Sequence, residues 1–198
     1  MNYFLGVGKT TLFHAIIHEE SVASSESSQG CMYLSKLCTF DNESFMLQIW
    51  DTAGQEKYKA IAPVYLRDTD IVVFVCDLTR KDSFFGLNDW IQLAKNYTPA
   101  STSWVFVGNK SDQPAEAWDV SEKNIAGLSS KYTERTSSKY FLTSGINYQG
   151  IVELLGELAR ISHGKWKEKM AMQGSGISTR LKKKMGIKTD AAQKSKCC

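Results

Sequence analysis

The feature that most constrains the fold is the continuous apolar run Ile71–Cys76, with the sequence IVVFVC. A short uninterrupted run of this kind is typical of a strand buried on both faces, and such strands belong to parallel sheets. Trp104–Val107 is a second run of the same kind. Segments with apolar residues near helical spacing alternate with these strands, namely Ser83–Tyr97, Glu122–Lys131 and Gln149–Ser162. The alternation predicts parallel βαβ units and an α/β sheet covered on both faces.

The flanking regions follow other patterns. Thr10–Glu20 predicts a helix, and the Ser-rich segment Ser21–Gln29 predicts a loop. A short polar turn between Met32–Phe40 and Ser44–Trp50 indicates a β-hairpin. Tyr140–Leu142 predicts a short strand. We expect one globular domain over residues 1–168 and a flexible basic tail over residues 169–198, where the periodic pattern dissolves.

Composition excludes several classes of protein. Hydrophobic residues make up 42% and charged residues 23% of the 198 residues, as in ordinary globular proteins. No apolar run reaches the roughly 18 residues that a membrane-spanning helix needs, and the N-terminus lacks the pattern of a secretory signal. We therefore expect a cytosolic chain in which the cysteines within strand-like segments are reduced and buried, namely Cys31, Cys38 and Cys76.

Charge is distributed unevenly along the chain. From Gly164 onward there are ten basic and two acidic residues, whereas the preceding part has 14 basic and 19 acidic residues. A mildly acidic body with a basic tail suits an anionic membrane surface or a nucleic acid. A tail that is simply solvated remains an alternative on charge alone.

The segment Gly6-Val7-Gly8-Lys9-Thr10-Thr11 has the pattern of the second half of a phosphate-binding loop. Glycines allow backbone N–H groups to curl around phosphates, and the positive end of the following helix adds to the attraction. Lys9 would reach the β and γ phosphates, and the Thr10 hydroxyl would bind Mg²⁺. A Gly-rich helix start with no ligand is the alternative if this segment is taken alone.

A second polar segment, Asp51-Thr52-Ala53-Gly54-Gln55, directly follows the apolar strand that ends at Trp50. An acid at a strand end can hold Mg²⁺, usually through water, and Gly54 offers a backbone N–H to a γ-phosphate. Gln55 is placed to orient a water for in-line attack and is our candidate catalytic residue. A simple turn explains any one of these residues, but it explains the whole segment poorly.

The third segment, Asn109-Lys110-Ser111-Asp112, follows the strand Trp104–Val107 and begins 58 residues after Asp51. The Asp112 carboxylate can accept hydrogen bonds from guanine N1–H and N2–H₂, a donor pair that adenine lacks. The Lys110 stem can lie over the ring face, and Asn109 can tie loops together. An N-capping loop is the alternative for this segment taken alone.

These motifs, together with Thr143-Ser144-Gly145, resemble those of the Ras-superfamily small GTPases. Trp50, Tyr58, Tyr65 and the terminal Cys197-Cys198 narrow the resemblance to the Rab family, over roughly residues 6–162 and the terminus. The resemblance implies a P-loop NTPase fold with a central, mostly parallel sheet. It also implies a GTP/GDP switch that hydrolyses GTP slowly and regulates vesicle trafficking, with Mg²⁺ as cofactor. Ser144 and Gly145 would complete the base site.

The same resemblance places the first switch segment at Glu26–Gly30, which is similar to the family sequence E-S-T-I-G. Ser28 would then bind Mg²⁺ and sense the γ-phosphate in place of a threonine. The resemblance also implies a surface that faces effectors, made by Gly30, Tyr33, Trp50 and Tyr65. For Trp50, packing within the hairpin and core is an equally good interpretation.

The N-terminal part departs from the family pattern. Tyr3 stands where the first glycine of the phosphate loop is expected, and no strand precedes the loop. We expect either a true start upstream of Met1 or a genuine short form that binds nucleotide poorly. Leu5 would crowd the attacking water, which predicts slow hydrolysis, and Ile146 replaces the lysine of the T-S-A-K pattern.

Cys197-Cys198 after a basic segment resembles the Rab tail that carries two geranylgeranyl groups, which would anchor the protein to membranes. The implied partners are Rab escort protein, geranylgeranyl transferase, GDP-dissociation inhibitor, an exchange factor, an activating protein and effectors, but no nucleic acid. The run Gln55–Thr79 is similar to endosomal Rabs. We therefore expect the cytoplasmic face of endomembranes, including endosomes, with cycling through the cytosol.

Two other functions stay open. The chain could be a Rab-like interaction module that binds nucleotide poorly and lacks GTPase activity. An ATP-dependent P-loop kinase is a third candidate, which Asn109–Asp112 disfavours. Nucleotide that co-purifies with the protein would separate these functions.

Overall fold

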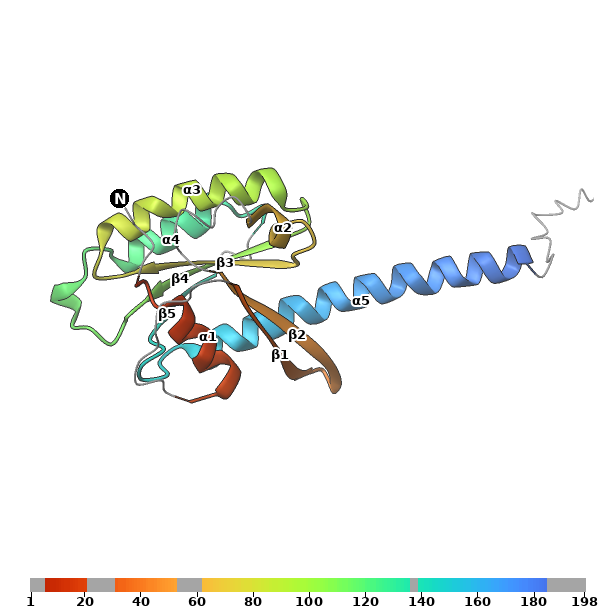
Figure 1. Ribbon diagram of the computed structural model, residues 1–198, viewed down its shortest axis with the longest axis horizontal. Coiled ribbons are helices and arrows are strands. Elements are labelled where there is room, and N and C mark those ends of the chain that lie inside the picture. Colours follow the sequence, from red (N-terminus) through yellow and green to blue (C-terminus); the bar gives the residue numbers. More distant parts are fainter. Residues whose placement is uncertain (1–5, 21–30, 53–61, 136–138, 185–198) are drawn as a thin grey trace, which may run out of the picture. The chain divides into compact units, whose positions relative to one another are not determined.

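The structure is a computed structural model that describes residues 6–20, 31–52, 62–135 and 139–184. The chain divides into two compact units, Met1–Ser162 and His163–Cys198. Figure 1 labels the helices and strands and colours them along the sequence.

The strands form two sheets. Strands β1 (Cys31–Phe40) and β2 (Glu43–Thr52) make an antiparallel hairpin whose turn residues Asp41 and Asn42 both have left-handed backbones. Strands β3 (Ile71–Asp77), β4 (Ser103–Asn109) and β5 (Tyr140–Thr143) form a parallel sheet in the order β3-β4-β5. The hairpin and the parallel sheet at Ile71–Cys76 agree with the sequence patterns.

Helices lie on both sides of the parallel sheet. Figure 1 shows α3 (Lys81–Tyr97) and α4 (Glu122–Lys131) on one side and α1 (Lys9–His18) on the other. Helix α3 packs against β3 because Leu87, Ile91 and Ala94 are buried at helical spacing. The short helices α2 (Ala62–Leu66) and η2 (Ala115–Ala117) have no periodic signal in the sequence.

The core lies between the parallel sheet and helices α3 and α4. Phe74, Phe106 and Trp104 contact one another through their rings, and each is at most 4% exposed. Ile91 from α3 and Ile125 from α4 complete this cluster. A core of this kind fixes the ends of β3, β4 and β5, where the polar side chains lie.

Helix α5 (Ile151–Lys184) is longer than the predicted Gln149–Ser162 and passes into the second unit. The helix thus continues to Lys184, into the segment 169–198 for which the sequence predicts a flexible tail. Lysine, glutamate, methionine and alanine make up residues 167–172 and have high helix propensity, whereas Gly174 and Gly176 do not. In the described part of the chain, no helix is both long enough and apolar enough to span a membrane.

The prediction of an α/β fold with a parallel sheet is confirmed. Within the described residues, the hairpin and the parallel strands form two separate sheets. Cys38 and Cys76 are free and buried, as expected. Burial raises the pKa of the Cys76 thiol to about 12, so this thiol stays protonated.

Candidate functional site

The polar side chains at the ends of the parallel strands lie side by side. Asp77 pairs in register with Asn109, and Asn109 pairs with Thr143. These positions are the last residues of β3, β4 and β5, and all three are buried. Ligands bind at this edge of open parallel sheets, because the loops that leave the strands converge there.

Asn109 joins three segments at this edge. Its Nδ2 donates to the Val7 carbonyl at 2.9 Å, and its Oδ1 accepts from the Thr143 hydroxyl at 3.1 Å. Val7 and Thr143 are fully buried, and Asn109 is 3% exposed. Through Asn109, the Gly-rich segment before α1 is therefore attached to the ends of β4 and β5.

The Gly-rich segment adopts a backbone that favours glycine. Gly6 and Gly8 have φ angles of 77° and 85°. Gly8 also lies so close to the Asn109 amide that a Cβ at this position would collide with Nδ2. Helix α1 begins at Lys9, and no side chain caps its N-terminus. The N–H groups in the first turn of a helix attract anions, phosphates above all.

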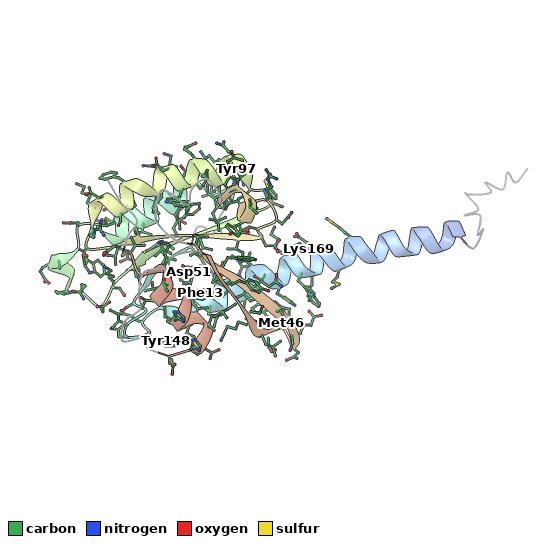
Figure 2. The ribbon with its side chains drawn as sticks, in the orientation of Figure 1. Phe13, Met46, Asp51, Tyr97, Tyr148 and Lys169 are labelled. Atoms are coloured by element: carbon green, nitrogen blue, oxygen red, sulfur yellow. The ribbon has the colours of Figure 1, made fainter. Side chains whose placement is uncertain are left out.

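Thr10 and Asp51 meet beside this helix start. The Thr10 hydroxyl donates to Asp51 Oδ2 at 2.7 Å, and Asp51 is 4% exposed. Figure 2 labels Asp51 on β2 near α1, at the opposite end of the hairpin from Met46. Burial lowers the pKa of Lys9, although the nearby Asp51 acts in the opposite direction. A buried ammonium, a hydroxyl and a carboxylate thus share one side of the site.

The Thr10–Asp51 pair fits a magnesium site. Hydroxyl and carboxylate oxygens are the hard donors that Mg²⁺ prefers, and this ion usually takes its other ligands from water and phosphate. Within the ranges described, no three His, Cys, Asp or Glu side chains gather to hold a metal by themselves. The pair therefore suits an ion shared with a bound phosphate better than a protein-only metal centre.

Asp112 lies in the loop after β4, which is attached to β5 by a hydrogen bond from Ser111 N to the Thr143 carbonyl at 3.0 Å. Partial burial acts to raise the pKa of Asp112, but the nearby Ser144 and Gln113 side chains hold it below its ordinary value. Gln113 donates to Oδ2 at 2.7 Å. The other oxygen, Oδ1, is buried without a hydrogen-bond partner among the described residues, which leaves an acceptor for a ligand donor.

The loop after β5 carries Ser144 and Gly145 toward the start of α1. Ser144 is buried, and its N–H donates to the Gln149 carbonyl at 2.9 Å. A Cβ on Gly145 would lie 3.0 Å from Leu12 N, so glycine allows a closer approach to α1 than alanine does. Ile146, which replaces the expected lysine, is half exposed. The base and phosphate segments are thus close neighbours.

Sequence reasoning missed Asp77 and Thr79. Asp77 is fully buried, and its Oδ2 lies 2.7 Å from Lys110 Nζ. Its Oδ1 accepts from the N–H and hydroxyl of Thr79, at 2.9 Å and 2.8 Å. The available signal was an acid at the end of a buried strand, the same signal that singled out Asp51.

The aromatic side chains predicted to face effectors gather on one surface. The ring centroids of Tyr33 and Trp50 are 4.7 Å apart, and those of Trp50 and Tyr65 are 5.3 Å apart. Tyr33 is 43% and Trp50 is 50% exposed, so Trp50 does not lie in the core. Its contact with Tyr33, the residue opposite it in the hairpin, is the hairpin packing that the alternative interpretation predicts. These rings offer an apolar surface with polar edges.

Several predicted residues lie outside the described ranges. They are Leu5, Ser28, Gly30, Gly54, Gln55, Cys197 and Cys198. Their assigned roles stay predictions.

A Gly-rich loop before a helix and an acid-bearing loop after β4, both attached to Asn109, define a P-loop nucleotide-binding fold. Residues 5–163 match the Ras family. The chain is 32% identical to Rab-21 of Geodia cydonium over 78% of its own length and 65% of the relative. It is 32% identical to Rab-5B of Dictyostelium discoideum over 79% of its length and 70% of the relative.

A plant relative, RABA1b of Arabidopsis thaliana, is 30% identical over 98% of this chain and 89% of its own length. Rab-22A of Mus musculus is 28% identical over 78% of this chain. The chain therefore belongs to the Ras family, and within it to the Rab small GTPases.

Proposed function

We propose that this protein is a guanine-nucleotide switch that binds GDP and GTP with Mg²⁺, hydrolyses GTP slowly and regulates vesicle trafficking at membranes. The observation that carries the proposal is the double attachment of Asn109 to Val7 and Thr143. This attachment holds a phosphate-binding segment and a base-binding segment at a fixed separation. A nucleotide carries its two recognition groups, the base and the phosphates, at such a fixed spacing.

On the phosphate side, the N–H groups at Gly6–Gly8 and the start of α1 bind the β-phosphate, and Lys9 adds a positive charge. Thr10 and Asp51 would hold Mg²⁺, with Ser28 as a further expected ligand. When bound, this ion neutralises charge that develops on the phosphates. Burial of Lys9 strengthens its attraction to a phosphate, because water screens the charge less.

On the base side, Asp112 selects guanine. Its buried Oδ1 accepts one of the two donors on the guanine edge, while the lowered pKa keeps the carboxylate ionised at neutral pH. The backbone N–H of Gly145 is available for guanine O6, and Ser144 supports Asp112. An adenine base would leave this buried acceptor unpaired, which is costly.

For hydrolysis, we assign Gln55 to orientation of the attacking water, as the family resemblance implies. Leu5 narrows the space for that water, which slows the reaction. The nucleotide state then controls the surface that contains Tyr33, Trp50 and Tyr65. Prenylation of Cys197 and Cys198 beside the basic tail anchors the protein to membranes.

The first test measures the binding of fluorescent GDP and ADP to the full chain with and without Mg²⁺. We expect GDP to bind and ADP not to bind. Asp112→Asn is the matched variant, because its amide donor complements the C2 carbonyl of xanthine. It should lose GDP and gain xanthosine diphosphate. A cooperatively folded wild-type protein that binds no GDP would refute the proposal.

The alternative is an interaction module that binds nucleotide poorly. The exposed rings of Tyr33 and Trp50 favour this candidate, because together they form an apolar surface of the kind that binds other proteins. Replacement of Cys197 and Cys198 by serine tests the membrane role of either form. The variant should move to the cytosol, and continued membrane association would contradict prenyl anchoring.

A further inference from the structure

Asp77 is a buried acid that the proposed nucleotide contacts do not use. Its side chain is fully buried at the end of β3, yet both carboxylate oxygens are engaged. Oδ1 accepts two hydrogen bonds from Thr79, and Oδ2 lies 2.7 Å from the Lys110 ammonium. The hydrogen bonds from Thr79 therefore orient the carboxylate independently of Lys110.

Lys110 is constrained at both ends. Its backbone has a φ angle of 67°, which residues other than glycine rarely adopt. The preceding residue, Asn109, is attached to Val7, and the N–H of the following Ser111 donates to Thr143. Because the ammonium is held at Asp77, the carbon chain of Lys110 spans two fixed points instead of moving freely in solvent.

A buried ion pair gives little stability by itself, because desolvation of the charges offsets their attraction. Its clearer effect is to fix geometry. The side chain of Lys110 is 33% exposed, so part of it remains open to a ligand, and its charge helps to lower the pKa of the nearby Asp112. A flexible lysine loses conformational entropy when a ring covers it, whereas a lysine already held in place loses less.

We propose that Asp77 is a positioning residue of the guanine site, which holds Lys110 so that its carbon chain lies against the face of the bound base. This inference rests on the proposed guanine-nucleotide function. Asp77 itself does not touch the ligand. Loss of its charge should therefore speed nucleotide release without changing the preference for guanine over adenine.

The test uses Asp77→Asn in the full chain. Asparagine can keep an oxygen toward Thr79, but it then presents an N–H₂ donor to the Lys110 ammonium, which is also a donor. We expect release of fluorescent GDP in excess Mg²⁺ to be about tenfold faster, as for loss of other groups that orient a ligand-binding side chain. Thr79→Val removes only one hydrogen bond to Asp77 and should give a smaller increase if Asp77→Asn does not fold.

A double-mutant cycle separates positioning from folding. Lys110→Met should also speed release, and Asp77→Asn added to Lys110→Met should change the rate no further. Glu157→Gln is the matched control, since Glu157 is a buried acid paired with Lys139 and Arg160. It should lower the melting temperature of the nucleotide-free protein and leave the GDP release rate unchanged.

The outcomes distinguish the two proposals. If the wild-type protein folds and binds no GDP, the proposed function fails. If it binds GDP but Asp77→Asn releases GDP at the wild-type rate, the positioning role alone is overturned. Additive effects of Asp77→Asn and Lys110→Met would also overturn it, because Asp77 would then act independently of Lys110.

Discussion

Replacement of Asn109 by alanine breaks the connection between the Gly-rich segment and the ends of β4 and β5. The wild-type side chain makes two hydrogen bonds, to the Val7 carbonyl and from the Thr143 hydroxyl. Neither partner is accessible to water, since Val7 and Thr143 both have 0% exposure. Alanine therefore leaves a buried acceptor and a buried hydroxyl without their partner.

The structure sets the magnitude of this effect. Each orphaned buried group costs about 1–3 kcal/mol, so the two together should lower the free energy of unfolding by about 2–6 kcal/mol. At about 2–4 °C per kcal/mol for a chain of this size, a loss of about 4 kcal/mol lowers the melting temperature by about 8–16 °C. Thr143→Val breaks only one of the bonds and should cost about 1–3 kcal/mol.

The measurement is urea unfolding in EDTA, so that nucleotide binding does not add to the stability. The control is Asn88→Ala, which removes an exposed hydrogen bond to the Phe85 carbonyl and should change the unfolding free energy by less than about 0.5 kcal/mol. If Asn109→Ala changes the unfolding free energy as little as Asn88→Ala does, the reasoning is refuted. The segment before α1 would then not depend on this tie.

Three further predictions concern the start of α1 and its neighbours. Gly8→Ala should lower the unfolding free energy by more than about 1 kcal/mol, because the φ angle at this position is 85° and the added methyl group would meet Asn109. The control is Gly127→Ala in α4, where a Cβ meets open space, and it should be neutral or stabilising. Lys9→Met should stabilise the nucleotide-free protein and abolish its stabilisation by GDP; an unchanged GDP-dependent melting shift would contradict this. Burial lowers the pKa of Lys9 below 10.5, so burying the charged ammonium destabilises the folded state fully at neutral pH. This destabilisation is relieved as the pH rises toward 10.5 and the folded protein loses the proton. The melting temperatures of wild type and Lys9→Met should therefore converge at alkaline pH. Leu5→Ser should speed single-turnover GTP hydrolysis with a matched activating protein, and equal rates would exclude crowding by Leu5.

Most of the fold could be predicted from local pattern. The run at Ile71–Cys76 and the Leu87, Ile91 and Ala94 spacing indicate their elements because burial imposes the same periodicity on almost any sequence. The extension of α5 beyond Ser162 could not be predicted in this way. The high helix propensity of residues 167–172 favours it, but Gly174 and Gly176, which have low helix propensity, follow within the same helix.

The candidate site was predictable where one residue type is chemically necessary at one place. Glycine is favoured at Gly8 because of its left-handed backbone. An acid at Asp112 is what the proposed guanine site would need to accept the donors of the base. Contacts between these segments were harder to predict from the sequence. The proximity of Gly145 to Leu12 depends on how the loop after β5 crosses the start of α1, which no local pattern encodes.

Asp77 shows where local reasoning ends. In the sequence it is one acid after an apolar strand, and the same description applies to Asp51, which meets Thr10 instead. Parallel pairing of β3 with β4 places Asp77 beside Asn109, and the left-handed backbone of the next residue, Lys110, allows its side chain to reach back to the carboxylate. The role of each acid is thus decided by the strand beside it. A buried acid at a strand end is therefore best interpreted through its register partner, and the Asp77–Lys110 cycle tests that principle in this protein.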